Sequence, residues 1–505
     1  MSIMNSKIEI ESSTCNLESI HSPIDIYESL RKKYKEEEII VLESMSGPEK
    51  DCTQSIIGFN PIISILVKNR KVSITGNELL VKKILNHELI QSYSIKNEQI
   101  EIINNSDVIS IFRAIESIFS ITYSGLPADI AVGFFGYFGY DSIFFFEDID
   151  QKMPRNKSFS DINMTLYQNI INVNLRDNKT TLTINNIKND LFPTSKKSEI
   201  VNLIAILNTT KHDNNCDVNY NYQSIPSVQK ELYFKWFDKA KGHINIGDIY
   251  QIQLGHEITI KSNMPPFQVY LRLRKYNPSP YMYFFKTSEG VYIIGASPEM
   301  FVTLTKHNDV IMRPIAGTIR NSNDPTIKEN NRKKLLSDEK EKAEHLMLVD
   351  LCRNDIARIC VPSSLKVNDL IVTEEYSHVI HLVSDISAKL KKGLDKYDVI
   401  EASFPAGTMT GTPKIRAIEI IEDTEISERG VYAGCIGFLG FNNILISALC
   451  IRTAVYHDGQ YSIRASGGIV EDSTNEGEWN ETISKLSSTY FAITNKELTS
   501  ESFIN

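Results

Sequence analysis

Two pairs of glutamates stand at helical spacing in the second half of the chain. Glu341 and Glu344 lie in a segment, 338–359, with helical periodicity, and Glu478 and Glu481 repeat the spacing near the C-terminus. Residues three apart on a helix share one face, so each pair points two carboxylates in the same direction. Facing pairs would suit Mg²⁺, which is commonly held by one or two carboxylates while water and an anionic substrate complete its shell. Either pair alone could equally be a solvated helix face.

Other segments offer groups that could bind an anion. Arg452 interrupts an apolar, strand-like run, where a guanidinium needs a carboxylate partner to offset its desolvation. That partner would be a substrate carboxylate or a structural ion pair. Gly467 and Gly468 would let backbone N–H groups approach an anion, although a plain tight turn explains them equally well. The loop 405–414 is rich in glycine and hydroxyl residues and leads into a predicted helix, which is weak evidence by itself.

Histidines that could act as acids or bases are sparse. His378 and His381 stand together in the segment 374–382. A histidine near a substrate could transfer protons at neutral pH, whereas a hydrogen-bonded core histidine is the alternative. The HExxH, paired CxxC and GxSxG patterns do not occur. The sequence therefore argues against zinc hydrolases and catalytic-triad hydrolases.

The elements that must position these groups mix helices with strands. Helices are predicted over 228–246, 338–359 and 479–494, and strands over 281–285, 290–294 and 432–439. This mixture indicates an α+β or α/β architecture. The segment 207–227 is polar and shows neither period, which places the main boundary there. We therefore predict an N-terminal region, 1–220, and a catalytic region, 221–500.

Composition excludes several classes of protein. The chain has 505 residues, 42% of them hydrophobic, and a net charge of −9, so it has no basic footprint for nucleic acid. Its seven cysteines are an odd number without CxxC spacing, which favours reduced thiols in the cytoplasm. The N-terminus does not have the pattern of a signal peptide, and the most apolar stretch, 131–146, is too interrupted to span a membrane. We expect no membrane or nucleic-acid partner.

A set of motifs in this order resembles the chorismate-utilising enzymes. The motifs are Gly-Asp-Ile-Tyr-Gln ending at Gln251, Gly-Ala-Ser-Pro-Glu ending at Glu299, Arg-Pro-Ile-Ala-Gly-Thr ending at Thr318, Glu344-His-Leu-Met-Leu-Val-Asp, His381-Leu-Val-Ser and Gly407-Thr408. The family includes anthranilate synthase large subunits, aminodeoxychorismate synthase component I, and isochorismate and salicylate synthases. The resemblance implies an α+β fold, a four-layer α/β/β/α sandwich with two large orthogonally packed sheets.

The resemblance also implies a role for each candidate residue. Glu344 and Glu481 would bind Mg²⁺, with Glu341 and Glu478 nearby, and the metal would hold the ring carboxylate of chorismate. Substrate binding would further use Tyr432, Arg452, Gly467, Gly468, Lys485 and Thr318. Ser466 departs from the glycine of many members. Glu299 would be the general acid that protonates the leaving C4 hydroxyl, with Gln251 and Thr408 in the catalytic set, and His381 would assist the later loss of pyruvate.

Two positions separate the subfamilies. Gln251 stands where the water-using members have a lysine, and an amide cannot act as the base that activates water. Ala316 stands where many aminodeoxychorismate synthases have a nucleophilic lysine, and alanine offers no nucleophile. The implied reaction is ammonia addition at C2 with loss of the C4 hydroxyl, followed by elimination of pyruvate to give anthranilate. An aminodeoxyisochorismate synthase, an aminodeoxychorismate synthase and a non-catalytic binding subunit remain alternatives.

The resemblance further implies two partners. The chain shows no Cys-His-Glu amidotransferase module, so ammonia would come from a separate glutamine amidotransferase subunit. Two segments resemble those of a tryptophan feedback pocket, and their candidate residues are Ser44, Pro278, Ser279, Pro280, Tyr281 and Met282. L-tryptophan is therefore an expected inhibitor, and a pocket retained without any regulatory response is the alternative.

Overall fold

Strands outnumber helices along most of the chain, in a computed structural model that describes residues 6–17, 22–155, 159–205, 220–376 and 379–499. The elements before residue 206 are β1 (Ile8–Leu17), α1 (Pro23–Leu30), η1 (Glu36–Glu38), β2 (Ile39–Glu43), β3 (Gln54–Lys68), β4 (Lys71–Gly76), α2 (Glu78–Leu85), α3 (Glu88–Gln91), β5 (Ile95–Lys96), β6 (Gln99–Glu101), α4 (Asp107–Ser117), β7 (Phe119–Gly125), β8 (Gly133–Phe138), η2 (Tyr140–Phe145), β9 (Ile162–Asn174), β10 (Lys179–Ile187) and α5 (Lys197–Ala205).

The second half continues the mixture of helices and strands. Its first elements are β11 (Tyr222–Pro226), α6 (Lys230–Asn245), β12 (Gln251–Ser262), α7 (Pro266–Tyr276), β13 (Tyr281–Lys286), β14 (Tyr292–Ser297), β15 (Met300–Leu304), β16 (Asp309–Met312), β17 (Ile315–Arg320), α8 (Pro325–Ser337) and α9 (Glu339–Ala357). They are followed by β18 (Lys366–Glu375), β19 (Val379–Lys389), α10 (Lys396–Ser403), η4 (Gly407–Met409), β20 (Gly411–Thr412), α11 (Lys414–Glu422), β21 (Cys435–Gly440), β22 (Leu445–Leu449), β23 (Thr453–His457), β24 (Gln460–Ile469) and α12 (Asn475–Thr494).

The helices and strands predicted from periodicity are present, with shifted ends. The helix predicted over 228–246 is α6, that over 338–359 is α9, and α12 begins four residues before the predicted start at 479. Side-chain caps explain where α9 and α12 begin, because Asp338 accepts hydrogen bonds from two N–H groups of α9 and Thr474 accepts one from Gly477. The strand predicted over 432–439 starts later, at Cys435, because residues 430–433 form a turn in which Ala433 has a positive φ of 66°.

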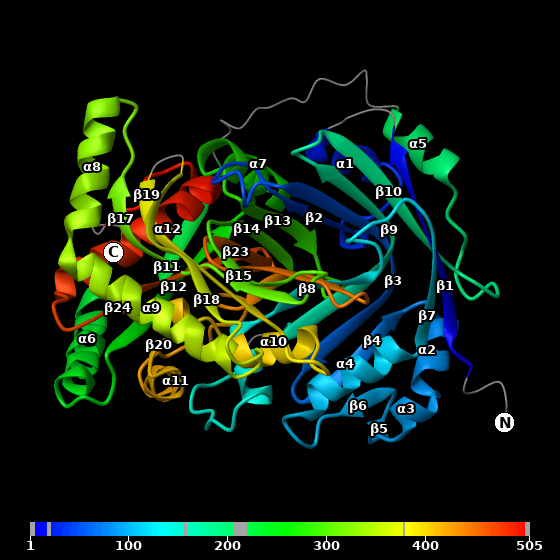
Figure 1. The fold of residues 1–505 in the computed structure, drawn as a ribbon, viewed down its shortest axis with the longest axis horizontal. Coiled ribbons are helices and arrows are strands. Elements are labelled where there is room, and N and C mark those ends of the chain that lie inside the picture. The colour runs from blue at the N-terminus through cyan, green and yellow to red at the C-terminus, as the bar shows by residue number, and fades with distance from the viewer. Residues whose placement is uncertain (1–5, 18–21, 156–158, 206–219, 377–378, 500–505) are drawn as a thin grey trace.

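Three apolar cores separate four layers of structure. One core packs α2, α3, α4, α9 and α10 against strands, and a second packs α1, α5, α6, α7, α11 and α12 against other strands. The third core consists mainly of strand residues, among them Phe135, Tyr167, Tyr283 and Phe438. Figure 1 shows α4 and α10 on one side of the strands and α1, α5 and α7 on the other. This arrangement is the predicted α/β/β/α sandwich of the α+β class.

Two long strands connect the layers. β3 and β9 pair along most of their length, and the register shifts between Pro61 and Ile63. Residues on one side of this shift, such as Ile57 and Phe59, enter the second core, whereas Ile63 and Ile65 enter the first. Because these strands pass from one layer of strands to the other, the strands form one continuous hydrogen-bonded network.

The two halves of the sequence are interleaved. β8 pairs antiparallel with β21, and β2 pairs antiparallel with β13, so strands from either side of residue 220 lie next to each other. The boundary itself falls beside 206–219, which lies outside the described residues. The division into 1–220 and 221–500 therefore stays a prediction about sequence. Within the described ranges, none of the helices combines the length and apolarity needed to cross a bilayer.

Candidate functional site

The two predicted acidic pairs face each other from α9 and α12. Glu341 and Glu344 lie in the first turns of α9, and Glu478 and Glu481 lie in the first turns of α12. The two pairs interact electrostatically: the charge of Glu481 contributes to raising the pKa of both Glu341 and Glu344, and the charge of Glu344 contributes to raising that of Glu478. The two pairs, which the sequence placed on separate helices, therefore lie near enough for their charges to interact.

These carboxylates are partly withdrawn from water. Burial is the main cause that raises the pKa of Glu344 to about 7, and the charges of Glu341 and Glu481 add to it against the opposing charge of Lys340. Burial likewise raises the pKa of Glu478 to about 7, with Glu481 the next cause. Burial is also the largest single effect on Glu481 and acts to raise its pKa, but the charge and hydrogen bond of Lys485, 2.6 Å away, together with the charges of Arg452 and Lys340 lower the pKa of that carboxyl overall. The cluster needs more positive charge than Lys340 and Lys485 supply.

A divalent cation fits this deficit of positive charge. One carboxylate oxygen of Glu478, Oε2, is buried and has no hydrogen-bond partner among the described residues. Hard oxygen ligands of this kind are the ones that Mg²⁺ takes. In the described part of the chain no three acidic, histidine or cysteine side chains stand close enough together to hold a metal. The Mg²⁺ site stays a prediction that the donor set supports.

Arg452 has no counter-ion among the described residues. It lies between β22 and β23 with a positive φ of 51°, and its Nη1 donates to the backbone carbonyl of Lys485 at 2.7 Å. No carboxylate lies within ion-pair distance of it in those parts of the chain that are described. Of the two partners left open by the sequence, a structural ion pair is therefore absent from this region. A guanidinium held by backbone carbonyls keeps its remaining donors for an anionic ligand.

The glycine pair Gly467–Gly468 ends β24 beside the acidic cluster. Strand β24 pairs with β12, and Gly467 and Gly468 stand opposite Leu254 and Gln253. A Cβ on Gly467 would lie 2.9 Å from the orphaned Oε2 of Glu478, and one on Gly468 would lie 2.7 Å from Nε2 of Gln253. Close approach of the backbone to the cluster, not a tight turn, explains these glycines.

Glu299 is the buried acid of the site. It follows β14, is 8% exposed, and its Oε1 accepts a hydrogen bond from the Thr408 hydroxyl at 3.1 Å. Burial raises its pKa to about 8, while Thr408 and the charge of Lys485 act in the opposite direction. At neutral pH this carboxyl therefore carries a proton, as the predicted general acid must.

His381 is held in the opposite protonation state. Burial lowers its pKa to about 4, and the charge of Arg452 contributes. Its Nδ1 lies 3.2 Å from the carbonyl of Gly317 and 2.9 Å from the Thr318 hydroxyl. Because a carbonyl can only accept, the proton resides on Nδ1 and leaves Nε2 as a base. His378 lies outside the described residues.

Strand β17 links the acid and the base. The backbone of Ile315, its first residue, hydrogen-bonds to Glu299, and Gly317, two residues on, holds His381. Ala316 lies between them and supplies no nucleophile, in agreement with the absence of a covalent intermediate in the predicted reaction. The predicted residues Glu299, Thr318, Thr408 and His381 thus meet around one strand.

Gln251 begins β12 at the same end of the sheet. It pairs with Thr412 and is 5% exposed, and its buried Oε1 has no hydrogen-bond partner in the part of the chain that the structure describes. Its Nε2 lies 3.4 Å from the place that a Cβ on Gly468 would take. The amide therefore points toward the glycine pair, with an acceptor that a small polar molecule could use.

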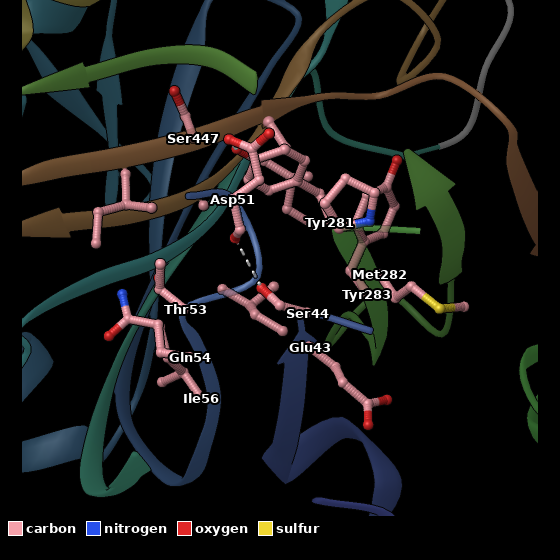
Figure 2. A pocket seen from close by; sticks show the side chains of 16 residues that line it. Glu43, Ser44, Asp51, Thr53, Gln54, Ile56, Tyr281, Met282, Tyr283 and Ser447 are labelled. Carbon is pink, nitrogen blue, oxygen red and sulfur yellow. Dashed lines mark hydrogen bonds between the residues drawn. The ribbon is translucent and has the colours of Figure 1, made fainter. Parts of the chain in front are cut away.

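A cavity separate from this site lies beside the paired strands β2 and β13 and is also lined by residues of β3, β21 and β22. It has a volume of about 490 Å³ with its open mouth, and its lining includes Ser44, Pro280, Tyr281 and Met282 of the predicted tryptophan residues (Figure 2). Pro278 and Ser279 do not line it: they belong to the turn before β13, where the carbonyl of Ser279 accepts a hydrogen bond from Met45. Apolar side chains that the sequence did not single out, including Ile56 and Ile446, also line the cavity.

Some connecting residues escaped sequence reasoning. Asp51 lines the cavity, accepts a hydrogen bond from Tyr281 and pairs with Arg313, which in turn binds Glu374 at 2.6 Å. Gln253 was missed as well, although it stands two positions after Gln251 on the same strand face, so strand alternation could have identified it. Asp51 offered no such signal, because its partners are remote in sequence.

Comparison with known proteins places the chain among its relatives. The family model of the chorismate binding enzymes matches residues 74–490. The chain belongs to this family. It is a chorismate-utilising enzyme of the anthranilate synthase and aminodeoxychorismate synthase type, because relatives of both names match it at more than 30% identity over most of its length.

These relatives differ in name. A 2-amino-4-deoxychorismate synthase of Streptomyces globisporus is 38% identical over 94% of both chains. Anthranilate synthase component 1 of Acetivibrio thermocellus is 33% identical over 90% of both. Among solved structures, anthranilate synthase component I of Streptococcus pneumoniae has a TM-score of 0.68 and 27% identity, covering 94% of this chain and 98% of that one. The predicted family and fold are therefore confirmed for this chorismate-binding enzyme, whereas its product is left open.

Proposed function

We propose that the chain is the large subunit of an anthranilate synthase, which converts chorismate and ammonia to anthranilate and pyruvate. One observation carries this proposal. Glu299 stays protonated while His381 stays unprotonated at the same neutral pH, and both are held by β17. Two titratable groups whose pKa values are driven apart in one site have the properties of a paired acid and base.

Chorismate would be held at both of its carboxylate groups, each by a different part of the site. Arg452 and the backbone around Gly467 and Gly468 would take one carboxylate, because the guanidinium has donors to spare. At the other end Glu344 and Glu481 would hold Mg²⁺, with Glu341 and Glu478 beside it. When bound, the metal supplies positive charge that anchors and orients an anionic substrate group. Lys485 connects the two ends, because it binds Glu481 and the carbonyl of Ser466.

In the first step Glu299 donates its proton to the C4 hydroxyl of chorismate, which leaves as water. Ammonia adds at C2 and the ring double bonds shift, so that the new C–N bond replaces the broken C–O bond. Gln251 supports ammonia over water, because its amide cannot deprotonate a water molecule but its free Oε1 can accept from an N–H. Glu299 is then left as a carboxylate that can take back the proton released by the new amine.

In the second step Nε2 of His381 removes the ring proton from C2. The C3–O bond breaks, the enolpyruvyl group takes up a proton and leaves as pyruvate, and the ring becomes aromatic. His381 is suited to this step because its Nδ1 proton is fixed by Gly317 and its Nε2 is free. This step distinguishes anthranilate from the intermediate that precedes it.

A second candidate stops after the first step. The 38% identical relative from Streptomyces globisporus is named for a product with an amino group at C2 that has lost the C4 oxygen. The same acid, amide and carboxylate-binding residues would serve that reaction. This candidate therefore differs only in whether His381 acts as a base on the bound product.

A product assay tests both candidates. The purified chain is incubated with chorismate, MgCl₂ and ammonium at mildly alkaline pH, and products are resolved by liquid chromatography and mass spectrometry. Anthranilate with equimolar pyruvate supports the first candidate, and an aminated product without pyruvate supports the second. A parallel sample with a chelator tests the metal: undiminished turnover there would contradict the Mg²⁺ proposal. No turnover of chorismate under any condition would contradict both candidates.

Ammonia would be supplied by a separate glutamine amidotransferase subunit. With the chain alone, glutamine should not replace ammonium, whereas addition of a compatible glutaminase should make glutamine a substrate. Turnover of glutamine by the isolated chain would contradict this assignment.

We further propose that L-tryptophan inhibits the enzyme from the cavity beside β2 and β13. Aromatic and aliphatic side chains line it, and Ser44 and Ser447 offer polar contacts (Figure 2). The chain of contacts Tyr281–Asp51–Arg313–Glu374 leads from the cavity to the strands that carry the site, since Arg313 precedes β17 and Glu374 stands opposite His381. A tryptophan titration that leaves the rate unchanged would contradict this proposal.

A further inference from the structure

The hydroxyl of Ser466 lies between two other polar side chains of the site. Its Oγ is 2.7 Å from the hydroxyl of Tyr432 and 3.0 Å from Oε1 of Gln253. Ser466 is 1% exposed, and Tyr432 and Gln253 are each 8% exposed, so water cannot replace these contacts. The three groups form a buried chain of hydrogen bonds, Gln253–Ser466–Tyr432, from β12 through β24 to the turn before β21.

This chain reaches the charged groups of the substrate site. The backbone carbonyl of Ser466 accepts a hydrogen bond from Lys485 at 2.9 Å, and the next two residues are the glycine pair. Tyr432 interacts electrostatically with both Arg452 and Lys485. Ser466 therefore contacts two of the groups around the proposed carboxylate position, one through its side chain and one through its backbone.

The direction of donation along the chain is restricted. With its oxygen toward Ser466, Gln253 only accepts, so Ser466 donates to it and Tyr432 donates to Ser466. The Tyr432 proton then points away from a ligand. A carboxylate bound at Tyr432 also only accepts, so Tyr432 must donate to it, and Ser466 must then donate to Tyr432. A primary amide allows this reversal, because turning Gln253 by half a revolution offers Ser466 an N–H in place of an oxygen.

We propose that Ser466 is a positioning residue, through which Gln253 orients the Tyr432 hydroxyl toward a substrate carboxylate. The proposal rests on the proposed function, in that the carboxylate is that of chorismate. In the bound state donation runs from Gln253 through Ser466 and Tyr432 to the carboxylate, and hydrogen bonds aligned in one direction strengthen one another. Without the serine hydroxyl the phenol loses its buried partner and its fixed orientation.

The test compares Ser466→Ala with Tyr432→Phe and with the double variant. Removing one hydrogen-bond partner should weaken chorismate binding about fivefold. We therefore expect Ser466→Ala to raise KM for chorismate by about this factor while kcat changes less than about twofold. In the Tyr432→Phe background the same change should have no further effect, because Ser466 acts through the phenol hydroxyl.

Controls separate positioning from general damage. Ser462→Ala removes another hydroxyl from the same face of β24 and should leave KM unchanged. Ser466→Thr, which keeps the hydroxyl, should restore the wild-type KM. If the alanine variant does not fold, Ser466→Gly takes its place in the test. Gly255 stands opposite Ser466 in the pairing of β12 with β24, so no side chain crowds this position from the neighbouring strand.

Direct binding keeps this test independent of turnover. Chorismate affinity is also measured by calorimetry with Mg²⁺ and without ammonia. If the wild-type chain binds chorismate but forms no product, the proposed function fails while the affinity of Ser466→Ala still tests Ser466. Equal affinity of wild type and Ser466→Ala, additive effects of the two substitutions, or no chorismate binding by the wild type would each overturn the proposal.

Discussion

The substrate site and the cavity beside β2 and β13 differ in how their charges are balanced. Around the substrate site, Arg452 lacks a carboxylate within the described residues, and Oε2 of Glu478 and Oε1 of Gln251 lack partners. Around the cavity the charges are paired: Glu43 binds Arg274 at 2.8 Å, and Asp51 binds Arg313. Buried polar groups without partners are costly, so they are retained where a ligand or ion completes them.

The comparison indicates two modes of binding. At the substrate site the ligands must bring charge, since the protein leaves charge uncompensated. At the cavity the protein is already neutralised, so a ligand there is held mainly by shape and apolar contact and changes activity by shifting paired groups. The following substitutions test this difference, beginning with the largest expected effect.

Glu299→Gln should abolish most of the activity. The amide keeps the size of the side chain but cannot donate a proton to the leaving hydroxyl, and general acid catalysis contributes about 10²–10⁴-fold. We expect kcat to fall by about a thousandfold with little change in KM, measured by anthranilate or aminated product formation. Glu401→Gln is the control, since Glu401 is a half-buried carboxyl whose pKa is also raised by burial, but it lies on α10 away from the site. A Glu299→Gln enzyme with near-normal kcat would remove Glu299 from the mechanism.

Arg452→Met should weaken chorismate binding more than it slows chemistry. The substitution removes the only charge assigned to the second carboxylate, and charge-assisted hydrogen bonds contribute about 1.5–3 kcal/mol each. We expect KM to rise by about a hundredfold. Arg353→Met, at an exposed arginine paired with Asp350 on α9, should leave KM unchanged. An unchanged KM in Arg452→Met, with the thermal midpoint lowered, would show that Arg452 is structural.

The pH profile should report the protonation of Glu299. Its folded pKa is raised to about 8, so the active protonated form predominates below that pH and is lost as pH rises through it. Rates expressed per concentration of unprotonated ammonia should fall about tenfold per pH unit above about pH 8. The positive charge of Lys485 lowers the pKa of Glu299, so Lys485→Met should raise that pKa and shift the alkaline fall in rate to higher pH. A profile that stays flat to pH 9.5 in the wild type would contradict the assignment.

Asp51→Asn should affect regulation and leave basal catalysis almost unchanged. The asparagine removes the charge that pairs with Arg313 and the acceptor strength offered to Tyr281. We expect the tryptophan concentration for half inhibition to rise by about tenfold, within the usual range of coupling energies, while kcat without tryptophan changes less than about twofold. Asp129→Asn, at an exposed aspartate paired with Lys306, is the control. Loss of basal activity equal to the loss of inhibition would show that Asp51 supports the fold and not the response.

The helices and the types of chemistry could be read from the sequence because they depend on local spacing. The pairs Glu341–Glu344 and Glu478–Glu481 each needed only helical periodicity. Their meeting could not be derived from that spacing, because it depends on α9 and α12 packing around strands remote in sequence. The family resemblance suggested that contact, and the shared Mg²⁺ site stays a prediction.

Predictions were weakest where turns decide orientation. Pro278 and Ser279 were placed in the tryptophan pocket with Pro280, Tyr281 and Met282, but only the last three face the cavity, since β13 begins at Tyr281. The role of Ser466 was also hidden, because a single hydroxyl gains meaning only from Tyr432 and Gln253, which lie 34 and 213 residues away in sequence. Side-chain direction in turns and remote hydrogen bonds are set by tertiary packing.

The pairing of β8 with β21 has a consequence for how the protein is made. Phe138 pairs with Cys435, so the first strand leaves the ribosome long before its neighbour exists. At about 5–20 residues per second, the usual pace of protein synthesis, this interval is on the order of tens of seconds. Throughout it, the Gly133–Phe138 strand, Gly-Phe-Phe-Gly-Tyr-Phe, lacks its β21 neighbour and exposes aromatic side chains that are later buried. Nascent chains of this enzyme should therefore depend on chaperones that cover apolar segments until translation is nearly complete.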